Sequence, residues 1–103
     1  MKGVDVMSNK KIYILTVAYN LYGKDSNTLI DVNTSIIAAY KSFKKAEKYA
    51  LQQCKRCAEF YEIDKDDFTG EKNQNCTTYH VGYTDNGIFI SYIIAEVELD
   101  LEL

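Results

Sequence analysis

Apolar and β-branched side chains dominate the first third of the chain, in two stretches separated by a polar turn. Residues 11–22 (KIYILTVAYNLY) are apolar or aromatic at both alternating positions, which predicts a central strand. Residues 23–27 have turn chemistry, and residues 28–40 (TLIDVNTSIIAAY) return to a β-branched run. We therefore expect the two stretches to pair as a hairpin.

A helical pattern follows the second stretch. Ser42 is a suitable N-cap, and good helix formers continue to about Glu62. One side of the predicted helix is apolar and should cover the sheet, with Phe43, Ala46, Ala50, Cys54, Cys57 and Tyr61. The opposite arc is basic and should face water or a partner, with Lys44, Lys45, Lys48, Lys55 and Arg56.

Two more strands are expected after the helix. Residues 63–76 are polar, contain Gly70 and lack periodicity, which predicts a loop. Residues 77–84 and the residues from Ile88 onward alternate, and Asn86-Gly87 between them predicts a two-residue type I′ turn. That turn places Tyr83 opposite Ile90 and predicts one buried face made of Tyr79, Val81, Tyr83, Ile90, Tyr92 and Ile94.

The alternation reverses in the last strand. After Ile94 the apolar residues are Ala95, Val97, Leu99 and Leu101, and the residues between them are acidic. A β-bulge between Ile94 and Glu96 would return the apolar row to the core. Without such a bulge, the row points elsewhere, at a partner.

These elements predict an α+β fold: a single small domain in the order ββαββ, with an antiparallel four-stranded sheet packed on one amphipathic helix. We assign residues 11–103 to this domain and residues 1–10 to a disordered leader, since 103 residues suffice for one hydrophobic core. No apolar stretch approaches the roughly 18 residues of a membrane span, and the N-terminus lacks a signal-peptide pattern. We expect a cytoplasmic protein with free thiols, because three cysteines cannot all pair within one chain.

Charge is divided unevenly along the chain. Up to Cys57 there are ten basic and four acidic residues, whereas from Ala58 there are two basic and eleven acidic residues. The acidic half predicts contacts with a basic partner protein through Asp64, Asp66, Asp67, Glu71, Glu96, Glu98, Asp100 and Glu102. Nine tyrosines, a residue type enriched at protein interfaces, favour binding over catalysis.

Candidate chemistry is weak by comparison. Cys54-x-x-Cys57 followed by Cys76-x-x-x-His80 has the order of a zinc site, but the first pair lies within a predicted helix. In an extended strand Cys76 and His80 would be about 13 Å apart, too far for one ion. The acidic residues after the helix do not match a calcium loop, because Phe68 occupies a ligand position. We therefore expect no metal, no cofactor and no enzymatic activity.

The hairpin–helix–hairpin plan, small size and net acidity resemble those of short phage and mobile-element proteins that occlude a larger machine, anti-CRISPR inhibitors among them. The resemblance implies a non-catalytic protein-binding module, a small inhibitor of a larger, basic, nucleic-acid-processing complex. The alternative is nucleic-acid binding by the basic helix arc, and a zinc or thiol protein is the third hypothesis. A homodimer formed by edge-strand pairing is also open.

Overall fold

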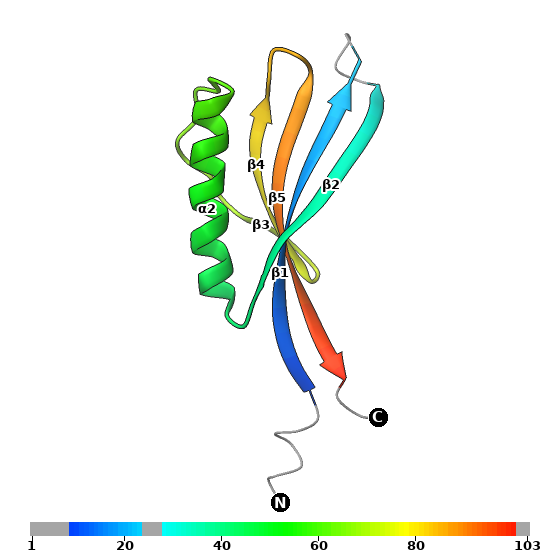
Figure 1. The fold of residues 1–103 in the computed structure, drawn as a ribbon, viewed down its shortest axis with the longest axis vertical. Coiled ribbons are helices and arrows are strands. Elements are labelled where there is room, and N and C mark those ends of the chain that lie inside the picture. The colour runs from blue at the N-terminus through cyan, green and yellow to red at the C-terminus, as the bar shows by residue number, and fades with distance from the viewer. Residues whose placement is uncertain (1–8, 24–27, 101–103) are drawn as a thin grey trace, which may run out of the picture.

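The computed structural model describes residues 9–23 and 28–100, which form one helix and a five-stranded antiparallel sheet (Figure 1). The sheet has the spatial order β2-β1-β5-β4-β3. The elements are β1 (Asn9–Tyr22), β2 (Leu29–Tyr40), α2 (Phe43–Phe60), β3 (Glu71–Asn73), β4 (Cys76–Tyr83) and β5 (Ile88–Asp100). The predicted α+β class with a single amphipathic helix is confirmed for this part of the chain.

The prediction of four strands in the order ββαββ is wrong by one strand, β3. This strand lies within the polar segment 63–76, and it pairs Glu71 with Thr78 and Asn73 with Cys76. A tight turn with Gln74 at φ 58° forms the β3–β4 hairpin. All three residues of β3 are exposed, so no hydrophobic alternation marks the strand in the sequence.

β1 is an interior strand of the sheet, with β2 and β5 on either side, but the middle strand of the five is β5 rather than β1 as predicted. It pairs with β5 from Asn9 opposite Asp100 to Leu21 opposite Ile88, and this ladder has no register shift. β1 starts two residues before the predicted start at Lys11, and residues 1–8 of the expected leader lie outside the described residues. The predicted pairing of β2 with β1 is confirmed.

α2 starts where the sequence predicts. Ser42 is its N-cap, and the Ser42 hydroxyl accepts a hydrogen bond from the Lys45 backbone N–H at 3.1 Å. The helix ends at Phe60, two residues before the expected end, because Glu62 adopts φ 58° and the chain leaves the helical path there. The buried side of the helix is made of Ala46, Ala50, Cys54, Cys57 and Ala58.

The register of the β4–β5 hairpin differs from the prediction in two places. The Gly87 N–H donates to the Thr84 carbonyl at 3.1 Å and Gly87 has φ 83°, so the loop has three residues (85–87) rather than two. A second shift lies between His80 and Gly82, where β4 carries one extra residue. Tyr83 therefore pairs with Phe89 instead of Ile90, and it is 48% exposed rather than buried.

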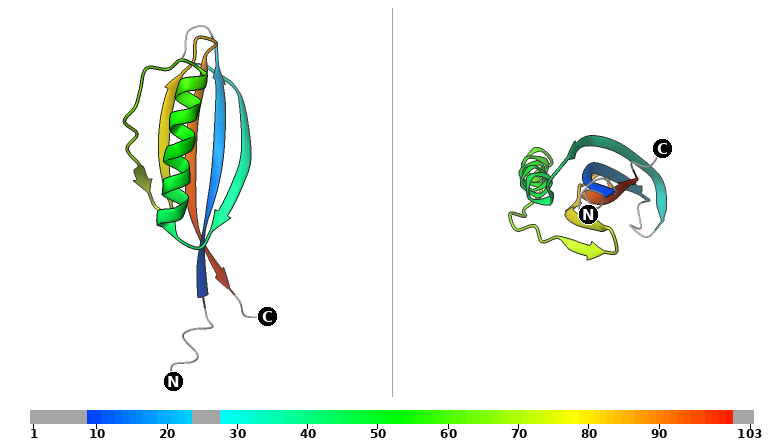
Figure 2. Two further views of the ribbon diagram at one scale, coloured as in Figure 1. Left: turned by 60° about the vertical axis from the view of Figure 1, so that its left-hand side comes forward. Right: turned by 90° about the horizontal axis from the view of Figure 1, so that it is seen from below.

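α2 covers one face of the sheet (Figure 2). The core lies between α2 and this face, and its strand residues are Leu15, Val17, Tyr79, Val81, Ile90, Tyr92 and Ile94. The predicted core face of β4 and β5 is therefore confirmed except for Tyr83. The two register shifts together move the pairing by two residues, which preserves the side on which each remaining side chain lies.

Within the described part of the chain, no helix has the length and apolar character required to cross a lipid bilayer.

Replacement of Ser42 by alanine should lower the free energy of unfolding by about 1 kcal/mol, because it removes the N-cap hydrogen bond to Lys45. Urea unfolding followed by circular dichroism measures the change. Ser35→Ala, at an exposed strand position, is the matched control and should alter stability by less than about 0.5 kcal/mol. Equal effects of the two variants would contradict the assigned cap.

Candidate functional site

The face of the sheet that points away from α2 is called the open face here. Its side chains follow from the register, because Leu15, Val17, Ile90 and Tyr92 lie in the core and their strand neighbours must point the other way. In β1 and β5 these side chains are Ile12, Ile14, Thr16, Ala18, Asn20, Phe89, Ser91, Ile93, Ala95, Val97 and Leu99. The flanking strands add Val32, Thr34, Ile36, Ala39, Cys76, Thr78, His80 and Tyr83.

The reversed alternation of β5 is responsible for much of this surface. The ladder between β1 and β5 runs through residues 94–96 without a bulge, so the acidic residues Glu96 and Glu98 lie on the same side as α2. Val97 and Leu99 lie on the open face, and Leu99 is 37% exposed. Of the two alternatives for this segment, the structure shows the one in which the apolar row points away from the core.

β2 also directs its apolar side chains away from α2, and these are more exposed than those of β5. Its side chains from Leu29 to Ile36 are all exposed. Val32 and Ile36 lie on the open face, opposite Asn20 and Thr16, whereas Asn33 and Ser35 lie on the helix side. Ile36 is 74% exposed and pairs with Thr16, directly beside the register shift between Leu15 and Thr16. β2 therefore has the alternation of a half-buried strand, but its apolar side has no cover among the described residues.

No Asp, Glu, Lys or Arg occupies the open-face positions of β1 from Ile12 to Asn20 or their partners in β2, β4 and β5. Among the residues that the structure describes, charged side chains on this face lie only at its margin. Lys10 lies at one end, and Glu71 of β3 lies at one side, where its carboxylate is 3.4 Å from Nε2 of His80. In a chain with 26% charged residues, this surface is unusual for its uncharged centre.

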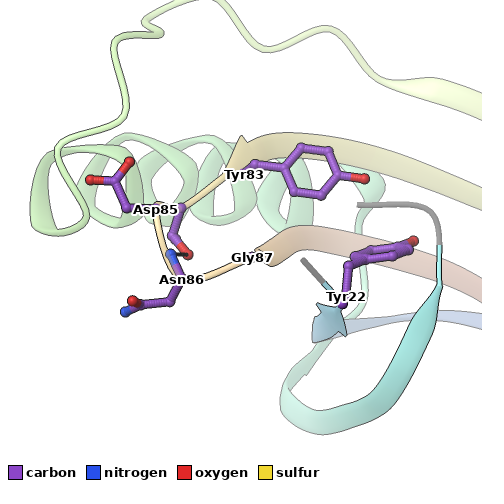
Figure 3. Close-up of a pocket in the computed structure, with 7 residues that line it drawn as sticks. Tyr22, Tyr83, Asp85, Asn86 and Gly87 are labelled. Carbon is purple, nitrogen blue, oxygen red and sulfur yellow. Dashed lines mark hydrogen bonds between the residues drawn. The ribbon is translucent and has the colours of Figure 1, made fainter. Parts of the chain in front are cut away.

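An aromatic cluster forms one end of the open face. Tyr83 contacts Tyr22 and Phe89 with ring centroids 5.5 and 5.0 Å apart, and Phe89 stacks on His80 at 5.1 Å. His80 is held in place by a hydrogen bond between Nδ1 and the Ser91 hydroxyl at 2.9 Å. Beside the cluster, Tyr22, Tyr83 and the β4–β5 turn line a hollow of about 320 Å³ (Figure 3).

Sequence reasoning missed this cluster, because it placed Tyr83 in the core. The extra residue of β4 next to Gly82 turns Tyr83 to the open face. Gly82 has φ 123°, a conformation that favours glycine, and a glycine within a strand pattern is a signal for a bulge.

The predicted acidic contact residues lie in separate places. Asp64, Asp66 and Asp67 are exposed in the segment after α2, close to Lys65, whose ammonium donates to the His80 carbonyl at 2.9 Å. Glu96 lies near the other end of β4, next to Asn75, and forms an ion pair with Lys11 at 3.2 Å. Glu98 is exposed on the helix side, and Glu102 lies outside the described residues, as does the side chain of Asp100.

The predicted basic arc lies on the outer side of α2. All five of its residues, Lys44, Lys45, Lys48, Lys55 and Arg56, are exposed. Lys45 and Lys48 line a shallow hollow of about 330 Å³ together with Tyr40, Tyr49 and Gln52.

The thiols and the single histidine do not converge. Cys54 and Cys57 are buried between α2 and the sheet, whereas Cys76 and His80 lie on the open face. Among residues 9–23 and 28–100 there is no group of three or more His, Cys, Asp or Glu side chains that could hold a metal ion. Burial raises the pKa of the Cys54 thiol from 9.0 to about 12 and also raises the pKa of Cys57, so both thiols are poor nucleophiles.

Comparisons of the chain with models of protein families, with curated proteins and with solved structures found no match.

The stability of the fold should decrease at alkaline pH. Burial raises the pKa of Cys54, Tyr79 and Tyr92 in the folded state, and the Tyr79 hydroxyl also donates to Glu47 at 2.7 Å. The folded chain therefore keeps protons that the unfolded chain loses. The stabilisation is complete below pH 9 and is lost as the pH rises toward the folded value of about 12 for Cys54.

Urea unfolding at a series of pH values tests this expectation. The free energy of unfolding should be constant between about pH 7 and 8 and should fall above pH 9. In Cys54→Ala the fall between pH 9 and 11 should be shallower by up to about 1.4 kcal/mol per pH unit, since one titrating group is removed. An identical slope in the variant would show that ionisation of Cys54 does not contribute to the loss of stability at alkaline pH.

Proposed function

We propose that this chain is a non-catalytic protein-binding module and that the open face is its binding surface. The observation that carries the proposal is that β1, β2 and β5 each direct one row of apolar side chains away from the one helix in the described residues, in addition to the rows of β1 and β5 that α2 covers. Fully burying an isoleucine side chain contributes roughly 1.5–3 kcal/mol. Val32, Ile36 and Leu99 are exposed, and the open-face side chains Ile12, Ile14, Ile93 and Val97 are half-buried, so contact with another molecule would bury further apolar area.

The end of the β1–β5 ladder that extends beyond the rest of the sheet, a two-stranded ribbon, supports the same proposal. There, β1 residues 9–12 pair only with β5 residues 97–100, and neither β2 nor β4 reaches this part of the ladder (Figure 1). An isolated two-stranded ribbon is marginally stable in water. Ile12, Val97 and Leu99 form its apolar side, which continues the open face. A protein bound to the open face would also bury this side of the ribbon.

The aromatic end of the surface has the composition of an interface. Tyr83 and Tyr22 combine large apolar rings with hydroxyl groups, and the edge-to-face contact between them and the tilted contact of Tyr83 with Phe89 hold them in position. Rigid aromatic side chains lose little conformational entropy on binding, which makes them effective anchors.

The more specific hypothesis is a small inhibitor of a basic, nucleic-acid-processing complex, such as an anti-CRISPR-like protein. It requires that acidic side chains contact a basic partner, and Glu71 at the margin of the open face is the acidic residue best placed for this. This hypothesis remains a prediction, as does nucleic-acid binding by the exposed basic arc of α2.

Affinity capture from an extract of the source cells tests the proposed surface. The wild type, Ile36→Lys and Ser35→Lys serve as tagged baits, each with and without nuclease treatment. The two variants add the same charge at adjacent exposed positions of β2, on opposite faces of the sheet. We expect a nuclease-resistant partner, which can be another copy of the chain, that the wild type and Ser35→Lys retain and Ile36→Lys loses.

Two other outcomes would overturn the proposal. Retention that is equal for both variants would place the binding surface elsewhere. Retention that nuclease abolishes, and that Lys44→Gln, Lys45→Gln and Lys48→Gln together remove, would assign binding to the basic arc and to nucleic acid.

A further inference from the structure

We propose that the occupant of the open face is a second copy of this chain, in a symmetric dimer in which two open faces pack together and the two helices lie outside. This inference rests on the proposed function, and it names the partner. Face-to-face packing of two sheets about 10 Å apart is a common way to bury one apolar side of each.

The distribution of charge favours a second copy. In a symmetric dimer each surface patch meets a copy of itself, so a charged patch meets like charges. The exposed outer arc of α2 is basic, and the segment after α2 exposes Asp64, Asp66 and Asp67. The centre of the open face carries no charged residue, so two copies can approach there without repulsion in a chain of net charge −3.

The open face has rows of small and large side chains, so the open faces of two copies can pack together. Small side chains form one row across β2, β1 and β5, with Thr34, Ala18 and Ser91, which pair in this order, and Ala18 and Ser91 are buried in the single chain. Larger side chains flank that row on both sides, with Val32 and Phe89 at one side and Ile36 and Ile93 at the other. Rows of different height allow the side chains of two sheets to interdigitate.

The size of the open face is sufficient for a dimer. With strands about 4.8 Å apart and residues about 3.3 Å apart, the part spanned by four strands measures roughly 20 by 25 Å, about 500 Å² in projection. Together with the apolar side of the ribbon formed by Ile12, Val97 and Leu99, the face approaches the lower range of standard interfaces, which bury about 600–1,000 Å² on each partner.

A dimer formed by backbone pairing between two β2 edge strands would not cover the apolar side chains of the open face. Such a dimer joins the backbones of two edge strands but adds no cover to the exposed Ile36 or to the half-buried Ile93 and Val97. Packing of the open faces covers all three.

Sedimentation equilibrium of the complete chain tests the inference with the variants Ile36→Lys and Ser35→Lys. The wild type and Ser35→Lys should reach twice the chain mass of 11.8 kDa at high concentration. Ile36→Lys should have a dissociation constant at least about 30-fold higher, because it would bury an unpaired charge against the uncharged open face of the other copy. Circular dichroism should show that all three proteins are folded, since both substituted side chains are exposed in the single chain.

Alkylation of Cys76 gives a second readout within the native sequence. Its side chain is half-buried on the open face, whereas Cys54 and Cys57 are buried in the core. Iodoacetamide should therefore modify Cys76 slowly at high protein concentration and faster on dilution. In Ile36→Lys the rate should be fast and independent of concentration.

The outcomes separate this inference from the proposed function. A dimer that Ile36→Lys does not weaken would overturn the face-to-face arrangement. A monomeric wild type that captures a different protein through Ile36 would overturn the second copy and retain the proposed function. A monomer that captures nothing through Ile36 would contradict both.

Discussion

The uninterrupted ladder between β1 and β5 determines which side chains α2 can cover. Its thirteen pairs, from Asn9–Asp100 to Leu21–Ile88, contain no bulge, so each side chain of the two central strands keeps the face that strict alternation assigns to it. Leu15, Val17, Ile90 and Tyr92 thereby meet the helix, and Ile14, Ile93, Ala95 and Val97 are directed away from it. A single bulge between Ile94 and Glu96 would have reversed the lower half of β5 and buried its apolar row.

One helix can cover only one face of a sheet, and the side chains of this chain are apolar on both faces. The helix side is close-packed: Leu15, Ala46, Ala50, Cys54, Val81 and Ile90 are fully buried. On the other side Ala18 is buried, the other apolar residues of β1 and most of those of β5 are half-buried, and those of β2 are largely exposed, up to 74% for Ile36. Such a surface gains stability only from contact with another molecule, and its uncharged centre makes another copy of the same surface a suitable partner.

The sequence predicts the elements well because each has a local cause. The Ser42 cap, the helical period up to Phe60 and the β-branched runs of β1 and β2 all act within a few residues. The register of β4 on β5 could not be predicted in the same way. Asn86-Gly87 suits both a two-residue and a three-residue loop, and the bulge beside Gly82 leaves the alternation of Tyr79 and Val81 unchanged. Tyr83 was assigned to the wrong face for that reason.

The candidate site could be predicted only in part. The reversed alternation after Ile94 is visible in the sequence, but whether a bulge cancels it depends on pairing with Asn9 to Ile12, which lie 85 to 91 residues earlier in the chain. The apolar side of β2 depends on where α2 packs, which no local pattern specifies. The acidic residues form one group along the sequence, yet the fold separates Asp64, Asp66 and Asp67 from Glu96, which pairs with Lys11.

Isotope-filtered NMR on a mixture of labelled and unlabelled chains measures contacts between copies most directly. If two open faces pack together, intermolecular NOEs should join methyl groups of Ile14, Ile36 and Ile93 in one copy to open-face side chains of the other. No such NOEs should involve the outer arc of α2. NOEs confined to the β2 edge or to the helix, or their absence at millimolar concentration, would contradict the account.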